Sequence, residues 1–194
     1  MSPLDLPHIP RRVITGVRKG KAVFLDDSAT PNAHVYEHIP GMVNSVVYRT
    51  AAPAVLPAIE NETAPPRSPL LPDEGGTSLV VVTFPPDSVF GTPGLDFAAA
   101  DKEQYDFAPD FAERFDKNAP GKHQTDSIDY DIVLDGEIWL ELDDETKHLR
   151  AGDIVIQGAA RHAWRNKGDR PATMCFVLIH VSAVDIQSPT KDPS

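Results

Sequence analysis

The chain has 194 residues, a hydrophobic fraction of 41% and a formal net charge of −11 at pH 7. This length allows one domain with a core of its own. The acidic balance argues against nucleic acid or an anionic membrane as a partner, because both need a basic surface. No stretch approaches the roughly 18 apolar residues of a membrane span, and the start lacks an apolar signal segment. We therefore expect a cytoplasmic protein.

The first part of the chain is predicted to hold strands separated by proline-rich connections. Within residues 11–50 we expect strands at 12–17, 21–27 and 43–50, the first two forming a hairpin, and a further strand at 77–84. Six prolines make residues 51–76 a long loop. Residues 1–11 are expected to form an arm on the surface or on a partner subunit, and the tail after Ala183 is expected to fray.

Residues 85–120 are predicted to be a second loop-rich insert with one or two short helical pieces. Between residues 98 and 115 three phenylalanines, Phe107, Phe111 and Phe115, recur at spacings of four. Because Pro109 interrupts a continuous helix, we expect short pieces that turn these rings inward. Core packing is favoured over substrate contact for them.

The second part of the chain is dense in short strands, expected at 127–134, 137–143, 145–150, 153–157, 162–166 and 173–181. The turn signal Asp135-Gly136 predicts a hairpin between the first two of these strands, and Ala151-Gly152 and residues 167–171 separate later ones. Short strands at this spacing indicate an all-β barrel or sandwich. The single cysteine, Cys175, rules out an intramolecular disulfide and is expected to be a buried, inert thiol.

Polar residues recur at every second position of two of these segments. His123, Thr125, Ser127 and Asp129 would share one face of the first segment, and His162, Trp164 and Asn166 one face of the second. Such groups inside a barrel are costly unless they bind something. Two imidazoles and a carboxylate suit a divalent metal with open positions.

These two segments resemble the motifs of the cupin family, whose fold is a small jelly-roll barrel called the double-stranded β-helix. The first motif matches at His123, Thr125, Asp129 and Gly136. The second matches at Gly152, Gln157, Ala159, His162 and Asn166, so the motifs occupy residues 121–181. The opening Arg11-Arg-Val-Ile-Thr-Gly is similar to that of a single-domain subgroup, which extends the resemblance to one domain over residues 1–194. Fungal members of that subgroup are similar to the cupin-domain oxidoreductases found in secondary-metabolite gene clusters.

The resemblance implies a catalytic pocket and, in metal-binding members, four ligands. Carried over, those positions are His123, Thr125, Asp129 and His162, and Thr125 is a poor ligand for a transition metal. The expectation is therefore divided between a three-ligand site for Fe, Mn, Zn or Ni at His123, Asp129 and His162, and a metal-free pocket that uses the same three as catalytic acids and bases. Substrate contacts are expected from four further residues: Thr125, Ser127, Trp164 and Phe84.

The functional expectation is an enzyme that oxidises or rearranges an apolar, oxygenated small molecule such as a polyketide or aromatic. The alternatives are metal-independent isomerisation, dehydration, cyclisation or decarboxylation by proton transfer, and a barrel that only binds its ligand. A storage role is poorly supported, because only one cupin repeat is present. By analogy with the family, a homodimer is expected.

Overall fold

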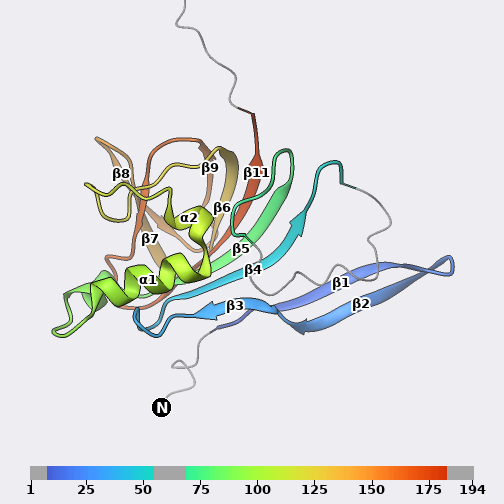
Figure 1. Ribbon diagram of the computed structural model, residues 1–194, viewed down its shortest axis with the longest axis horizontal. Helices are drawn as coiled ribbons and strands as arrows, with labels where there is room; N and C mark the ends of the chain where they lie inside the picture. The colour runs from blue at the N-terminus through green and yellow to red at the C-terminus, as the bar shows by residue number, and fades with distance from the viewer. Residues whose placement is uncertain (1–7, 55–68, 183–194) are drawn as a thin grey trace, which may run out of the picture.

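The computed structural model describes residues 8–54 and 69–182 and is mostly β (Figure 1). Most of the expected N-terminal arm, much of the 51–76 loop and the tail after Ala183 lie outside the described residues. No described helix is long and apolar enough to cross a membrane. The elements, in chain order, are β1 Arg11–Arg18, β2 Lys21–Ala29, β3 Asn32–Val35, β4 Val43–Thr50, β5 Thr77–Phe84, a 3-10 helix Asp87–Gly91, α1 Phe97–Phe107, α2 Pro109–Ala112, β6 Ser127–Asp135, β7 Glu137–Glu141, β8 Thr146–Arg150, β9 Ile154–Gly158, β10 Ala163–Arg165 and β11 Ala172–His180.

Two antiparallel sheets enclose the core. The larger has the strand order β3-β4-β5-β11-β6-β9, and the smaller has the order β10-β7-β8. Apolar side chains from both sheets pack together between them: Val133, Ile138, Leu140, Trp164, Ala172 and Met174. Because side chains alternate along each strand, each sheet buries one face against the other. The all-β double-stranded β-helix fold expected from the sequence is confirmed.

The hairpin predicted at Asp135-Gly136 is wrong, and the turns at Ala151-Gly152 and at residues 167–171 do not join paired strands either. Strand β6 pairs with β9 and β11, whereas β7 pairs with β8 and β10, so at each of these three turns the chain crosses from one sheet to the other. Gly136 has a φ of +76°, and a Cβ there would lie 2.7 Å from the carbonyl oxygen of Pro171. The Asp-Gly pair therefore forms a tight turn between the two sheets. Such a turn needs the same positive φ as a hairpin turn, so the sequence does not distinguish the two.

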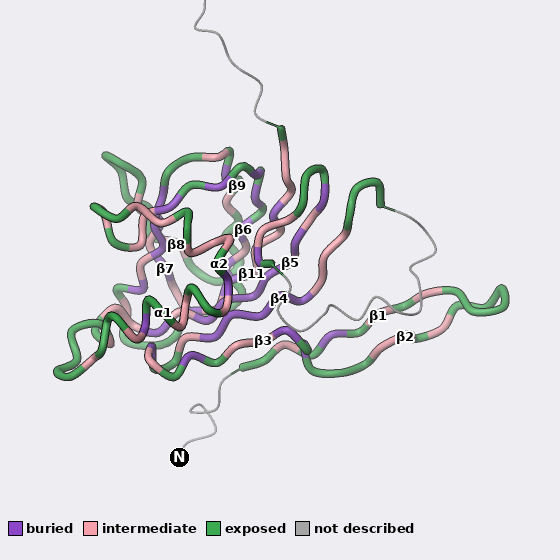
Figure 2. Tube along the Cα trace, in the orientation of Figure 1, coloured by how far each residue is buried: buried purple, intermediate pink, exposed green. Residues whose placement is uncertain are grey.

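The predicted hairpin at the start of the chain is confirmed. Strands β1 and β2 pair with each other in a separate two-stranded sheet that extends from the body of the molecule (Figure 1). Figure 2 shows that this hairpin is largely exposed, whereas buried residues concentrate in the larger sheet. Strands β4 and β5 match the prediction to within a residue, but the short strand β3 was missed because Asn32-Ala-His-Val has no strand-like alternation.

The predicted helical pieces are confirmed as α1 and α2, which lie over strands β4 and β5 (Figure 1). Asp96 caps α1 by accepting a hydrogen bond from the amide of Ala99, and Pro109 separates the two helices. The carboxylate of Glu103 accepts hydrogen bonds from the amides of Glu37 and His38. These bonds tie the helical insert to the segment that follows β3.

Candidate active site

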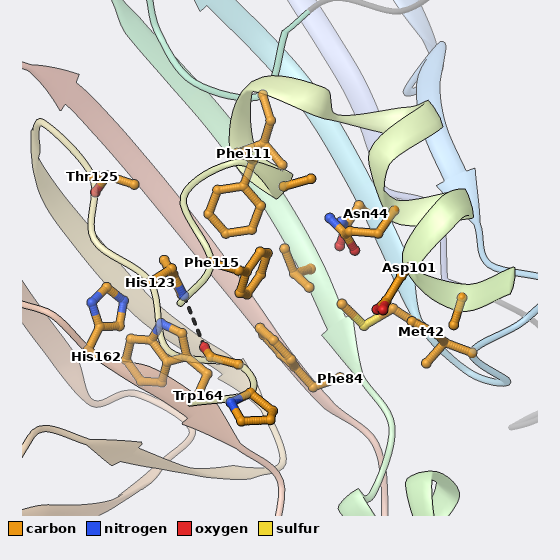
Figure 3. Close-up of a pocket in the computed structure, with 18 of the residues that line it drawn as sticks. Met42, Asn44, Phe84, Asp101, Phe111, Phe115, His123, Thr125, His162 and Trp164 are labelled. Atoms are coloured by element: carbon orange, nitrogen blue, oxygen red, sulfur yellow. Dashed lines mark hydrogen bonds between the residues drawn. The ribbon is translucent and has the colours of Figure 1, made fainter. Parts of the chain in front are cut away.

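The space between the sheets and the helical insert is a cavity of about 590 Å³. Figure 3 shows His162 and Trp164 at one end of it, Met42, Asn44 and Asp101 at the other, and phenylalanine rings between them. Six of the seven residues that the sequence predicted for the site line this cavity: Phe84, His123, Thr125, Asp129, His162 and Trp164.

The two histidines are joined through their backbones. The amide of His123 donates to the carbonyl of His162 at 2.9 Å, and the amide of His162 donates back at 3.0 Å. This isolated antiparallel bridge brings the two ring centroids within 4.4 Å of each other. The two sequence motifs therefore meet at one point of the cavity wall, as their alternation predicted.

Both rings are held in the same tautomer. Nδ1 of His123 lies 3.2 Å from the carbonyl oxygen of Gly121, and Nδ1 of His162 lies 2.8 Å from that of Ala160. Since a carbonyl oxygen only accepts, each Nδ1 carries the proton and each neutral ring keeps its lone pair on Nε2. Burial and the neighbouring His162 lower the pKa of His123 to about 3, and burial lowers the pKa of His162. Both imidazoles are thus mainly neutral near pH 7.

Asp129 lies deeper on the same face of β6, and it is 5% exposed. Its register partner on β9 is Gln157, so their side chains point to the same side of the sheet. Burial raises the pKa of Asp129, an effect partly offset by the hydroxyl groups of Ser127 and Thr125. Its Oδ1 has no hydrogen-bond partner among the described residues, nor has Nε2 of Gln157.

Two of the residues picked out from the motifs support the site from outside the cavity lining. Ser127 Oγ donates a hydrogen bond of 2.9 Å to Thr125 Oγ1. Asn166 Nδ2 donates to the carbonyls of Phe84 and Arg170, and so fixes the end of β10 against the end of β5. Ser127 and Asn166 therefore orient the residues that do face the cavity.

Asp131 is a buried acid that the sequence reasoning missed. It is 1% exposed, and neither of its carboxylate oxygens has a partner among the described residues. Burial and the charge of Asp129 raise the pKa of Asp131 to about 8, so near pH 7 Asp131 is mostly protonated and Asp129 carries the charge. The alternation that places Asp129 on the inner face continues to Asp131, and following it two residues further would have identified this group.

The helical insert supplies aromatic walls close to the histidines. The rings of Phe111 and Phe115 lie 4.9 Å and 5.2 Å from that of His123, centroid to centroid. Phe107 instead packs against the core, as expected. The expectation that these phenylalanines only pack in the core is therefore incomplete, because Phe111 and Phe115 also line the cavity. Their contact with His123 depends on long-range packing, which their spacing does not reveal.

The predicted three-ligand metal site is not assembled. Within residues 8–54 and 69–182 no group of three or more His, Cys, Asp or Glu side chains could hold a metal ion. The bridge brings His123 and His162 together, but Asp129 lies further along β6 opposite Gln157, and Thr125 stands where a further imidazole would be needed. Because a catalytic metal usually takes at least three protein ligands, these residues do not fit the expected Fe, Mn, Zn or Ni ion.

Comparison with known proteins identifies the segment that contains both histidines. Residues 113–180 match the family model described as "Cupin domain". "Phomopsin biosynthesis cluster protein C'" of Diaporthe leptostromiformis is 42% identical over 66 residues, which are 33% of this chain and 35% of that protein. "Cupin-domain-containing oxidoreductase virC" of Hypocrea virens is 38% identical over 68 residues, 33% of this chain and 35% of the relative. The matched segment spans about a third of these curated relatives.

Solved structures give more distant likenesses. A sugar phosphate isomerase from a cupin superfamily of Silicibacter pomeroyi has a TM-score of 0.40 and 13% identity, and the match covers 89% of this chain and 72% of that one. A Cupin 2 conserved barrel domain protein from Salinispora arenicola has a TM-score of 0.38 and 13% identity, with coverage of 72% and 76%. Residues 113–180 thus match a cupin domain, and the chain is distantly related to proteins of fungal secondary-metabolite clusters.

Proposed function

We propose that this protein is an enzyme of secondary metabolism that rearranges an apolar, oxygenated small molecule by proton transfer. The observation that carries this proposal is the pair of neutral imidazoles in one aromatic-walled cavity, each with its proton fixed on Nδ1. A neutral Nε2 is a base, and a buried, aromatic-lined cavity is typical of small-molecule sites.

Three groups divide the work in this proposal. His162 accepts a proton from the substrate at Nε2, because its Nδ1–H donates the shorter hydrogen bond, 2.8 Å to Ala160 against 3.2 Å from His123 to Gly121, and that bond supports the imidazolium better. Once His162 is protonated, His123 has to stay neutral, since two cationic rings 4.4 Å apart would repel. The carboxylate of Asp129, on the same cavity wall, stabilises the imidazolium in this intermediate state.

The proposal is tested with 2′-hydroxychalcone, an aromatic phenol that cyclises when base removes its hydroxyl proton and a carbon accepts one. The oxygen–carbon bond that forms closes a ring without any change in oxidation state. We expect the protein to accelerate this cyclisation, followed by the loss of chalcone absorbance, equally in air and under argon and equally with and without EDTA. His162→Asn should abolish the acceleration. Acceleration that requires oxygen or a metal would refute proton transfer as the chemistry.

Oxidation is the second candidate, and one observation favours it. Two of the relatives, from Hypocrea virens and Aspergillus ruber, are named cupin-domain-containing oxidoreductases. Oxygen consumption with the same phenol, measured with an oxygen electrode, distinguishes the two candidates. Tight binding of the phenol without either reaction would instead support a ligand-binding barrel.

We also propose that the partner is a second copy of this chain, joined through the β1–β2 hairpin. A two-stranded hairpin is marginally stable alone in water, and this one exposes 75% of Phe24. Light scattering should give a dimer mass for the wild type and a monomer mass for Phe24→Ser. Thr15→Ser, at the position that pairs with Phe24, is the matched control and should leave the dimer intact. A monomeric wild type would rule out this partner.

A further inference from the structure

The histidine end of the cavity is built from hydrogen-bond acceptors. The two imidazoles donate their Nδ1–H groups to the carbonyls of Gly121 and Ala160, so that each Nε2 can only accept. Asp129 adds a carboxylate whose Oδ1 is buried and has no partner among the described residues. A buried acceptor without a partner is costly, and that cost is removed when a ligand donates to it.

The nearby hydroxyl protons are already engaged. Ser127 donates to Thr125, and both hydroxyl groups lie against Asp129. The cavity lining as a whole also carries more negative than positive side chains. Five carboxylates, those of Asp87, Asp101, Glu113, Asp116 and Asp129, face two cations, Lys117 and Arg165. An anionic ligand would thus meet both a shortage of donors and an unfavourable field.

The remaining walls of the cavity are aromatic and favour a ligand that contains aromatic rings. Phe111 and Phe115 pack against His123 on one side, and Trp164 packs against His162 and Phe176 on the other. Ring edges and faces at these separations favour another flat ring between them. The cavity of about 590 Å³ accommodates fused rings.

We infer that the cavity binds a neutral fused-ring phenol, whose hydroxyl group donates to one of the three acceptors on this wall: Nε2 of His123, Nε2 of His162 or Oδ1 of Asp129. The inference rests on the proposed function, since it concerns the same cavity, and it narrows the substrate class from apolar oxygenated molecules to phenols with a free hydroxyl. A methyl ether lacks the donor and leaves the acceptors unpaired. A carboxylate places a second negative charge beside Asp129.

The test is calorimetric titration of the full chain with three matched probes: 2-naphthol, 2-methoxynaphthalene and 2-naphthoate. We expect 2-naphthol to bind about tenfold more tightly than its methyl ether, the usual value of one hydrogen bond, and 2-naphthoate to bind most weakly. Equal binding of all three probes, or tighter binding of the ether or the carboxylate, overturns the inference about phenols. Either result still shows that the cavity binds aromatic molecules, as the proposed function requires. No binding of any probe overturns both.

Asp129→Asn tests the carboxylate among these acceptors. The amide removes the charge and offers a donor of its own, so the preference for the phenol over the ether should fall to about threefold or less. Asp135→Asn, an exposed change at the end of the same strand, is the matched control and should retain the full preference. An unchanged preference in Asp129→Asn would exclude Asp129 from the recognition of the hydroxyl group. The comparison of probes on the wild type needs no variant and stays decisive if Asp129→Asn fails to fold.

Discussion

The cupin segment, residues 113–180, and the described residues before it contribute different things to the same cavity. The cupin segment supplies the titratable groups His123, Asp129 and His162. The earlier residues supply walls: Met42 and Asn44 from β4 and the turn before it, Phe84 from the end of β5, and Phe111 from α2. The family model matches residues 113–180 and does not extend to Met42, Asn44, Phe84 or Phe111.

The proposed proton transfer and the selection of the substrate would therefore depend on different regions of the chain. His123 and His162 are held by an isolated backbone bridge and Asp129 by the register of β6, whereas part of the wall comes from a helical insert tied to the body by the hydrogen bonds of Glu103. A barrel can keep its reactive centre while the insert changes the shape of the space in front of it. Under the proposed function, the cupin segment would fix the reaction and the earlier residues would help to select the substrate.

The largest effect should come from comparing one residue of each region on the chalcone cyclisation. His162→Ala should lower kcat by about 10²- to 10⁴-fold, because it removes the proposed base. Phe111→Leu should raise KM by about threefold to tenfold and change kcat little, because it alters a wall. Steady-state kinetics measures both. A large loss of kcat in Phe111→Leu would show that the insert takes part in the chemistry.

A core truncation in the cupin segment should destabilise the protein strongly. Ile138 is fully buried between the two sheets. Ile138→Ala should lower the free energy of unfolding by about 2–5 kcal/mol, measured by urea denaturation. Ile154→Ala, at a position 65% exposed on β9, is the matched control and should change it by less than about 1 kcal/mol. Equal losses would mean that Ile154 is covered in solution.

The buried acid Asp131 should make the stability of the barrel depend on pH. Its pKa is raised to about 8 in the folded state, so its favourable contribution is complete below the ordinary value of 3.8 and is lost as pH rises through about 8. Asp131→Asn should therefore stabilise the protein by on the order of 2–4 kcal/mol at pH 9, with a gain that shrinks towards pH 4. Melting temperatures across this range are the measurement, and a gain independent of pH would contradict the assignment.

The smallest effect should come from the tether of the insert. Burial alone would raise the pKa of Glu103, but the amides of Glu37 and His38 and the ring of His34 outweigh it and hold that pKa below the usual 4.5. The stability it adds is present above about pH 4.5 and is lost as pH falls through the folded value. Glu103→Gln should cost about 1–2 kcal/mol at pH 7 and less at pH 3.

Asp106→Asn, which breaks an exposed ion pair with Lys102 on the same helix, is the control for Glu103→Gln. It should change the unfolding free energy by less than about 0.5 kcal/mol. Thermal melts at the two pH values compare the variants. If Glu103→Gln behaves like its control, the insert is held by apolar packing alone.

What the sequence could predict follows from the range of the interaction concerned. Alternation along 123–129 correctly gave the buried face of that segment, because period-2 burial is a local property. The turn at Gly136 was misassigned, because a positive φ is local but the strand that follows it pairs with distant partners. The position of Phe111 beside His123 depends on packing between segments that no spacing encodes.

The backbone bridge between His123 and His162 has a consequence for how the protein folds. These two residues are 39 positions apart, and their rings meet only when the strands between them have already been distributed over both sheets. Contacts of such long range form late, after the entropy of closing the intervening chain has been overcome. The proposed base and its neighbour are therefore assembled only in the completed barrel, and a partly folded chain would have no acid–base pair to expose to the cell.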